Sequence, residues 1–402
     1  SGDEAVNPGL STALSVEPDV LKRHLSGRLD AMVELLSELV RVESPTDVPS
    51  SHARAHEILV DAWARLGYRN RFIPGRRTSG HRLFAPTARV RGRPVQLMVG
   101  HLDTVWPLGT LERMPVRLED GLLRGPGVFD MKAGLVMMIF AVEALQALSI
   151  PASVTPLAFV NSDEEVGSPE SRREVRRLAR VSSRALILEP ALGISGKVKT
   201  ARKGVGHFTV AIQGRAAHAG LDPEVGTSAI LELSHVIQAL HGLNDLERGL
   251  TVNVGVIEGG TRPNVIAARS EARVDVRALS LKDAEEVTAA ILGLEPKVPG
   301  VELSVTGGIE APPLERTPRN RRLWDQTRRL GAELGLELED VTAGGGSDGN
   351  TTSQYTATLD GLGPRGDGAH AEREHIVVES LVERTAVLTA LLAAPLAREE
   401  VA

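Results

Sequence analysis

The strongest constraint on this chain is the alternation of short apolar runs with helical patterns in its first half. Apolar runs at 94–99, 156–160 and 185–188 are separated by helical patterns at 131–148 and 174–181. Two amphipathic patterns, at 19–42 and near 52–66, predict helices before the first of these runs. Strands that alternate with helices form a sheet whose faces the helices cover. We therefore predict the α/β fold class.

The pattern changes between residues 198 and 313. Strands are predicted at 206–213, 251–257 and 268–278, around helices at 228–241 and 281–292. This order indicates a small α+β sandwich inserted in the larger domain. The α/β pattern then resumes with helices at 320–334 and 378–394. We expect a discontinuous larger domain, residues 1–197 with 314–402, and an inserted domain, residues 198–313.

Composition excludes several classes of protein. The 402 residues are 42% hydrophobic and 24% charged, as in soluble globular proteins. The net charge of -6, from 46 basic and 52 acidic residues, provides no basic surface for nucleic acid. Because the chain has no cysteine, disulfides, thiolate zinc sites and iron–sulfur clusters are excluded.

No membrane partner is expected. The longest apolar run, 133–145, is interrupted by Glu143 and is too short to cross a bilayer. Residues 1–4 lack the basic start and apolar run of a signal peptide. We expect a cytoplasmic protein, or a periplasmic or secreted one if a leader has been removed.

Imidazole and carboxylate groups follow three of the predicted strands. Those at or just after the strand ends are His101, Asp103, Glu164, Glu165 and Glu189, and Asp130 precedes the helix at 131–148. Each alone has a structural explanation, such as a hydrogen-bonded histidine, solvated loop carboxylates or an N-cap aspartate. Together, however, carboxylates that converge at one sheet end repel unless cations compensate. Zinc takes these ligand types when no thiolate is available.

Five segments resemble the successive motifs of the co-catalytic zinc amidohydrolases. They are Gly100–Val105, Gly125–Gly134, Ser162–Ser168, Leu188–Pro190 and Gly368–His370. That superfamily includes glutamate carboxypeptidases, aminoacylases, acetylornithine deacetylase and succinyl-diaminopimelate desuccinylase. Within it, segments 344–350, 359–363 and 368–370 look closest to glutamate carboxypeptidases of the folate-cleaving type.

The resemblance implies a metallopeptidase domain, with a mixed sheet flanked by helices, and an inserted ferredoxin-like lid and dimerisation domain. It also implies two zinc ions per subunit, for which cobalt or manganese could substitute. One zinc would be held by His101 and Glu189 and the other by Glu165 and His370, with Asp130 bridging them.

The resemblance assigns catalytic roles to three further residues. Asp103 would orient the ring of His101, and Glu164 would be the general base. His218 would stabilise the oxyanion, reaching the site of the opposite subunit of a homodimer. The other histidines match no motif and are expected to be structural or exposed, namely His24, His52, His56, His81, His207, His235, His241 and His375.

Three residues are assigned to substrate binding by the same resemblance. Asn264 and Arg277 would hold a carboxylate, for which the planar fork of arginine is suited. Gly346 would line the pocket within the turn 344–350, which lacks the Gly-Lys-Ser/Thr of a nucleotide loop. The alternatives are a surface cation for Arg277 and a flexible loop for the turn.

The function that follows is hydrolysis of a peptide or amide bond beside a free carboxylate, releasing C-terminal glutamate from a small peptide or N-acyl-amino-acid substrate. An N-acyl-amino-acid deacylase or dipeptidase would share the mechanism. A catalytically inactive binding protein on the same fold is the other alternative. Glu164 argues against it, because inactive relatives can lose the base while they keep the core.

Overall fold

A computed structural model describes residues 16–397, which divide into two compact units. Within the described residues, the first unit comprises 16–200, Thr317–Val341 and 355–397, and the second comprises Ala201–Arg316 and Thr342–Gln354. Residues 1–4, expected not to form a signal peptide, lie outside the described residues. Within 16–397, no helix is both long and apolar enough to cross a membrane. Which unit is catalytic and which is a lid stays a prediction.

The first unit is built on a six-stranded mixed sheet. Its order is β1 (Tyr68–Ile73), β2 (His81–Pro86), β6 (Thr155–Asn161), β3 (Val95–His101), β7 (Arg184–Ile187) and β14 (Ala357–Leu359). Strands β6, β3, β7 and β14 are parallel, and β2 runs antiparallel to both β1 and β6. The predicted mixed sheet is therefore confirmed.

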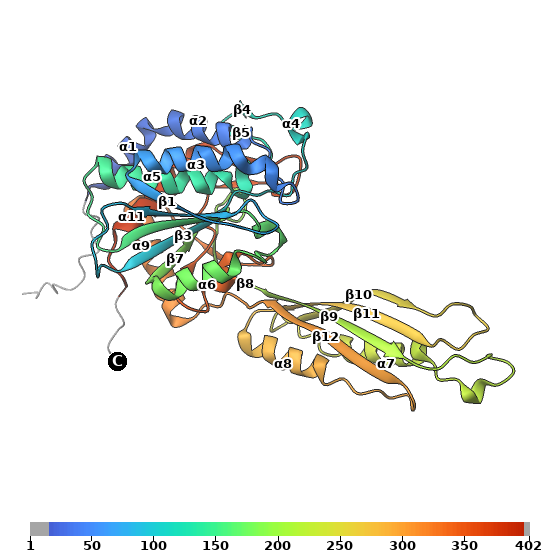
Figure 1. The fold of residues 1–402 in the computed structure, drawn as a ribbon. Helices are drawn as coiled ribbons and strands as arrows, with labels where there is room; N and C mark the ends of the chain where they lie inside the picture. The colour runs from blue at the N-terminus through green and yellow to red at the C-terminus, as the bar shows by residue number, and fades with distance from the viewer. Residues whose placement is uncertain (1–15, 398–402) are drawn as a thin grey trace, which may run out of the picture. The chain divides into compact units, whose positions relative to one another are not determined.

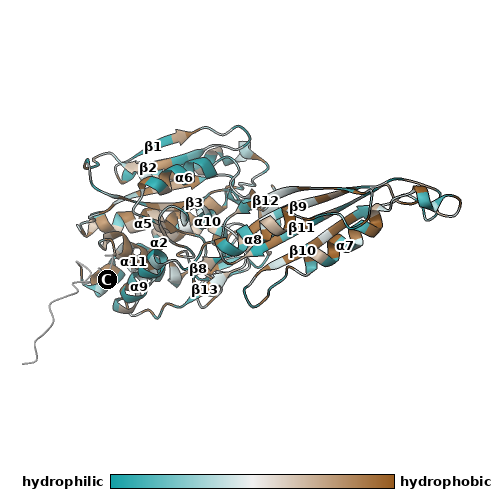
Figure 2. Ribbon diagram, turned by 90° about the horizontal axis from the view of Figure 1, so that it is seen from below, coloured by the Kyte–Doolittle hydropathy of each residue, from teal (hydrophilic) through white to brown (hydrophobic). Residues whose placement is uncertain are grey.

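Helices cover both faces of this sheet (Figure 1). On one face lie α1 (Pro18–Gly27), α2 (Leu29–Val40), α3 (Ala53–Arg65), α5 (Ala133–Ala147), α9 (Pro318–Glu333) and α11 (Glu379–Ala393). On the other face lies α6 (Arg172–Val181), which is hydrophilic outside its buried stripe (Figure 2). Successive strand residues point to opposite faces, so Met98 packs in the α5 core while Leu97 and Val99 pack towards α6.

The N-terminal helical pattern differs from the prediction of one helix over 19–42. The structure has two helices, α1 and α2, that meet at Arg28. The Arg28 N–H bonds to Leu25 and Ser26 carbonyls rather than continuing the regular ladder. Gly27 precedes this break, and glycine is a weak helix former.

Short elements complete the first unit. A four-stranded sheet contains β15 (Gly366–Asp367), β16 (His375–Val377), β5 (Leu122–Arg124) and β4 (Arg117–Glu119). The short helices are η1 (Pro49–His52), α4 (Thr110–Arg113), η2 (Val128–Lys132) and η3 (Glu164–Val166). A two-stranded sheet pairs β8 (Val198–Arg202) with β13 (Asp340–Ala343), and each of these strands begins in the first unit and ends in the second.

The second unit is the expected ferredoxin-like domain. Its antiparallel sheet has the order β10 (Thr251–Gly259), β11 (Arg269–Ala278), β9 (Gly204–Gln213) and β12 (Glu302–Ala311). Helices α7 (Ala229–His241) and α8 (Leu281–Leu292) pack on one face through a core of its own. The chain order β9-α7-β10-β11-α8-β12 is the βαββαβ arrangement. The unit also contains η4 (Pro223–Val225) and α10 (Asp348–Thr352).

Candidate metal centre

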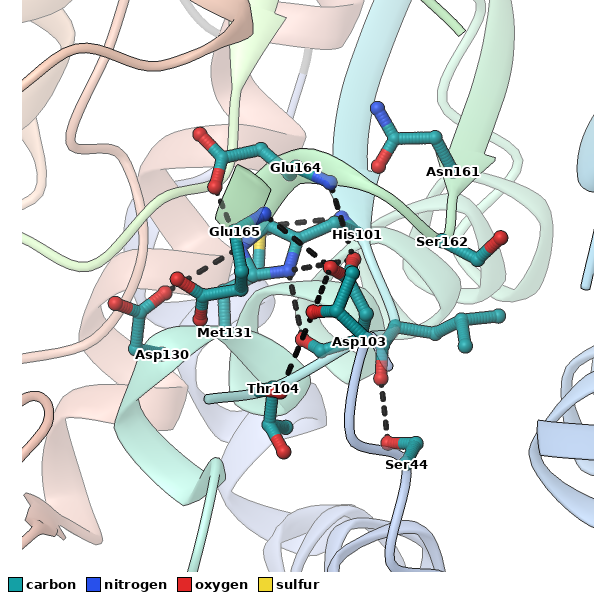
Figure 3. Close-up of polar contacts among 12 residues, drawn as sticks. Ser44, His101, Asp103, Thr104, Asp130, Met131, Asn161, Ser162, Glu164 and Glu165 are labelled. Carbon is teal, nitrogen blue, oxygen red and sulfur yellow. Dashed lines mark hydrogen bonds and ion pairs between the residues drawn. The ribbon is translucent and has the colours of Figure 1, made fainter. Parts of the chain in front are cut away.

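His101 ends the buried strand β3 and is held by the turn that follows. Its Nδ1 lies 2.9 Å from the main-chain oxygen of Asp103 and 3.4 Å from the Asp103 carboxylate. Nδ1 therefore keeps a proton, and Nε2, on the other side of the ring, is the nitrogen that can offer a lone pair to a metal once it is deprotonated. The side chains of Asp130 and Glu164 lie around this ring in Figure 3.

Asp103 also fixes the segment that follows β6. Its carboxylate accepts the main-chain N–H of Glu164 at 3.3 Å and that of Glu165 at 3.2 Å. Burial would raise the pKa of Asp103, but hydrogen bonds from His101, Thr46 and Glu165 outweigh it and lower that pKa. The residue expected to orient His101 thus remains ionised and joins two ligand-bearing segments.

Asp130 lies between two histidines. Its Oδ1 is 3.3 Å from His101 Nε2, and its Oδ2 is 3.3 Å from His370 Nε2. Its peptide bond to Met131 is cis. One carboxylate thus faces both imidazoles, the placement that the resemblance implies for a bridging ligand.

A glutamate completes the surroundings of each histidine. Glu189 Oε1 is 3.2 Å from His101 Nε2, and Glu165 Oε2 is 3.2 Å from His370 Nε2. Gly134 allows α5 to approach the Glu189 segment, because a Cβ there would lie 2.1 Å from the Leu188 oxygen. The structure therefore brings together the five residues expected to hold metal.

The donor set fits a pair of divalent cations. His101 Nε2, Asp130 Oδ1 and Glu165 Oε1 are buried without a hydrogen-bond partner. Buried polar atoms are costly when they are left unpaired, and cations would satisfy all three. Among residues 16–397, ligand atoms that lie within 4.8 Å of one another form two groups, His101 with Asp130 and Glu165, and His101 with Glu164 and Glu189.

Crowding of like charges shifts the protonation equilibria of these residues. Burial, together with the nearby Asp130 carboxylate, raises the pKa of Glu165 to about 7 although His370 opposes this shift. Hydrogen bonds to Asp130 and Glu165 raise the pKa of His370 to about 10. Protons on the imidazoles thus balance the carboxylates here. Metal ligation requires deprotonated nitrogen, so ions would displace these protons.

Glu164 differs from Glu165 in its position. Its carboxylate is 3.7 Å from His101 Nε2, farther than the oxygens of Asp130 and Glu189. Its side chain is 13% exposed, whereas that of Glu165 is 7% exposed. The adjacent glutamates therefore point to different parts of the centre.

The remaining predicted site residues lie in the second unit. His218 is exposed, and its Nδ1 accepts the N–H groups of Gly220 and Leu221 at 3.1 and 3.2 Å. The main-chain oxygen of Asn264 accepts the Ala219 N–H.

Two of the predicted substrate-binding residues have partners within this unit. The Arg277 fork makes two 3.0 Å hydrogen bonds to Asp275. Gly346 lies just before α10, and its carbonyl is 3.3 Å from an Arg202 guanidinium nitrogen. The roles of His218, Asn264, Arg277 and Gly346 stay predictions.

The sequence did not single out two residues that support the centre. Thr46 donates to Asp103, and Glu374 accepts N–H groups from the Asp130 segment. No motif or periodicity indicated them, because their contacts join distant parts of the chain. His375, which lies close to His370 in sequence, instead forms part of β16 and pairs with Arg124.

Comparisons with known proteins agree on the family. Residues 97–394 match the model of peptidase family M20/M25/M40. The chain is 27% identical over 393 residues to carboxypeptidase G2 of Pseudomonas sp. (strain RS-16), covering 95% of this chain and 93% of that protein.

Solved structures share the fold. Aminopeptidase PepT from Bacillus cereus ATCC 10987 matches with a TM-score of 0.76 and 22% identity, over 91% of this chain and 98% of that one. YXEP from Bacillus subtilis, a dinuclear metal binding peptidase from the M20 family, matches with a TM-score of 0.67 and 14% identity, over 92% and 98% of the two chains. The chain therefore belongs to peptidase family M20/M25/M40, a family of metallopeptidases and amidohydrolases.

Proposed function

We propose that this chain is a dizinc hydrolase that cleaves a peptide or amide bond beside a free carboxylate and releases C-terminal glutamate. The observation that carries the chemistry is the Asp130 carboxylate, which faces both His101 and His370 at 3.3 Å. The likeness to carboxypeptidase G2 along nearly the whole chain supports a carboxypeptidase reaction, and the choice of glutamate comes from the resemblance of segments 344–350, 359–363 and 368–370 to glutamate carboxypeptidases.

The charges of the ligand set can be balanced by two divalent ions. Asp130, Glu165 and Glu189 supply three negative charges, which two dications exceed by one. When bound, the two ions would polarise the scissile carbonyl and make water available as a nucleophile near neutral pH. Cobalt or manganese could take the place of zinc with these ligands.

Glu164 is the group that moves the proton. Its main-chain N–H is fixed by Asp103, and its side chain reaches the edge of the centre beside His101. It would take a proton from the attacking water and deliver it to the leaving amine. Asp103 keeps the proton of His101 on Nδ1, so that Nε2 stays directed at the centre.

The second unit would supply the substrate contacts. Because His218 Nδ1 accepts two N–H groups, its Nε2–H is the donor available to a developing oxyanion. The Arg277 fork would exchange Asp275 for the substrate carboxylate, with Asn264 and the Gly346 loop beside it. We further propose a homodimer in which His218 serves the partner's centre.

The test is hydrolysis of N-acyl amino acids by the zinc-loaded protein, with the acyl group fixed and the leaving residue varied among Glu, Asp, Ala, Leu and ornithine. Strong preference for Glu supports the proposal. Preference for an apolar or basic residue would instead indicate a deacylase or dipeptidase with the same centre. No hydrolysis of any substrate by protein that holds two zinc ions would favour a binding protein.

A further inference from the structure

Glu374 is a buried carboxylate surrounded by N–H donors. It is 1% exposed and belongs to none of the ligand pairs described above. Its Oε1 accepts the main-chain N–H groups of Phe129 and Asp130, both at 3.0 Å. Its Oε2 accepts the Gly127 N–H at 2.9 Å and the Trp106 indole N–H at 2.7 Å. With four donors directed at it, this side chain acts as an ionised acceptor.

These donors come from two different segments that carry metal-centre residues. Gly127, Phe129 and Asp130 belong to the loop that presents the Asp130 carboxylate. Trp106 lies three residues beyond Asp103, and its own N–H bonds to the Thr104 hydroxyl in the turn that follows His101.

The backbone of Glu374 belongs to a third such segment, the turn of His370. The Glu374 N–H donates to the Ala371 oxygen, and the Ala371 N–H donates to the Gly368 oxygen, both at 2.8 Å. His370 itself has a φ of 61°, a left-handed conformation that a non-glycine residue keeps only when its surroundings enforce it. Glu374 thus belongs to the same turn as His370 and is hydrogen-bonded to the main chain of Asp130.

We propose that Glu374 is a positioning residue that sets the separation of Asp130 and His370, and with it the capacity of the centre to hold two metal ions. This inference rests on the proposed function. It concerns a residue that contacts no proposed ligand side chain but holds the main chain from which Asp130 projects. Supporting hydrogen bonds of this kind strongly affect metal affinity.

Glutamine cannot replace this carboxylate. Whichever way its amide is turned, the NH₂ group faces two N–H donors, either Phe129 and Asp130 or Gly127 and Trp106. Glu374→Gln therefore removes the charge and disrupts two of the four contacts at nearly constant volume. Glu372 is the matched control, because it lies in the same turn, pairs with Arg113 at the surface and is 70% exposed.

The experiment titrates chelator-treated wild type, Glu374→Gln and Glu372→Gln with zinc by calorimetry and records the visible spectrum of each with cobalt. Wild type and Glu372→Gln are expected to bind two ions with the same affinities and spectra. Glu374→Gln is expected to bind at least one ion about tenfold or more weakly and to show an altered cobalt spectrum. A general loss of stability would not change the cobalt spectrum of folded, saturated protein.

Unchanged affinities and spectrum in Glu374→Gln would overturn the positioning role while leaving the proposed function intact. A wild type that binds no zinc and hydrolyses no amide would instead contradict the proposed function. If Glu374→Gln fails to fold, Trp106→Phe tests the positioning role instead, because it keeps the Glu374 carboxylate and removes only the indole N–H donor. We expect it to weaken zinc binding severalfold, and wild-type affinity in that variant would overturn the role.

Discussion

The Thr46 hydroxyl donates a hydrogen bond of 2.7 Å to the carboxylate of Asp103. The same carboxylate receives the N–H groups of Glu164 and Glu165 and holds the ring of His101. A residue far earlier in the chain thus fixes the acceptor on which the metal-centre segments depend. A hydrogen bond to a charged group contributes about 1.5–3 kcal/mol, so its loss should be measurable.

We therefore predict that Thr46→Val weakens zinc binding about tenfold, because Asp103 loses one donor and the His101 ring is held less firmly. Thr46→Ser keeps the hydroxyl and serves as the control. Calorimetric zinc titration of both variants checks the prediction. If the valine and serine variants bind zinc equally, the Thr46 hydroxyl has no part in holding the centre.

Glu164→Ala should keep both metal ions and lower kcat by about 10²–10⁴, the contribution usual for a positioned general acid–base. Metal content by mass spectrometry and turnover of the best substrate in the leaving-residue panel check the two parts separately. Glu372→Gln, which alters an exposed carboxylate, should retain full activity. Retained turnover in Glu164→Ala would show that another group transfers the proton.

Metal binding should also stabilise the folded chain. Ions that bind the folded centre but not the unfolded chain add about 2.7 kcal/mol when present at a hundredfold excess over Kd. Zinc added to chelator-treated protein is therefore expected to raise Tm. Asp130→Asn should greatly reduce this rise in Tm, because the Asp130 carboxylate faces both His101 and His370. The control Asp61→Asn, which alters an exposed carboxylate, should preserve the rise. An equal rise in both variants would contradict a bridging Asp130.

The sequence predicted the parts of the fold in which hydrophobic pattern and burial coincide. Strands β3, β6 and β7 are buried along their length, so each reads as an apolar run. Strands β1 and β12 were missed, because most of their residues are exposed or half-buried and their patterns are polar. The Arg-rich stretch 76–93, for which no strand was predicted, contains β2, which pairs with β6 through the buried Phe84.

The candidate site likewise contains residues that the sequence could place and one that it could not. Residues directly after strands could be placed together, since the carboxyl ends of parallel strands meet at one edge. Glu374 could not be placed in this way, because its hydrogen-bond partners Trp106 and Gly127 are 268 and 247 residues away in the sequence. Such a contact depends on the final packing of loops, which no local periodicity encodes.

Acid stability should depend on His56. Burial, together with Arg82, His52 and His81 nearby, lowers its pKa from 6.5 to about 4. Between these values the unfolded chain binds a proton that the folded chain does not. The stability from neutral His56 is therefore complete above pH 6.5 and is lost as the pH falls towards 4.

The measurement is the free energy of unfolding of metal-free protein at pH 7 and pH 4. We expect wild type to lose up to about 3 kcal/mol more than His56→Gln over this range. Glutamine can still accept from Arg82 and donate to Ser79, the two present partners of the ring. The exposed His241→Gln should follow wild type. Parallel pH curves for wild type and His56→Gln would contradict the buried neutral histidine.

Subunit mixing tests whether His218 acts on the partner's centre. His218→Ala and Glu164→Ala should each be inactive as homodimers, since each lacks one group from every site. In a heterodimer, the chain that keeps Glu164 receives His218 from its partner, so one of two sites is complete. Random exchange of equal amounts should therefore restore about a quarter of the wild-type activity per chain.

The matched control mixes wild type with the double variant His218→Ala/Glu164→Ala. If His218 acts across the dimer, neither site of this heterodimer is complete, and exchange should reduce the activity of the mixture from about half to about a quarter of wild type. If His218 acts within its own chain, the control keeps half of the activity and the first mixture gains none. The two mixtures respond in opposite directions, so loss of protein during exchange cannot imitate the expected result.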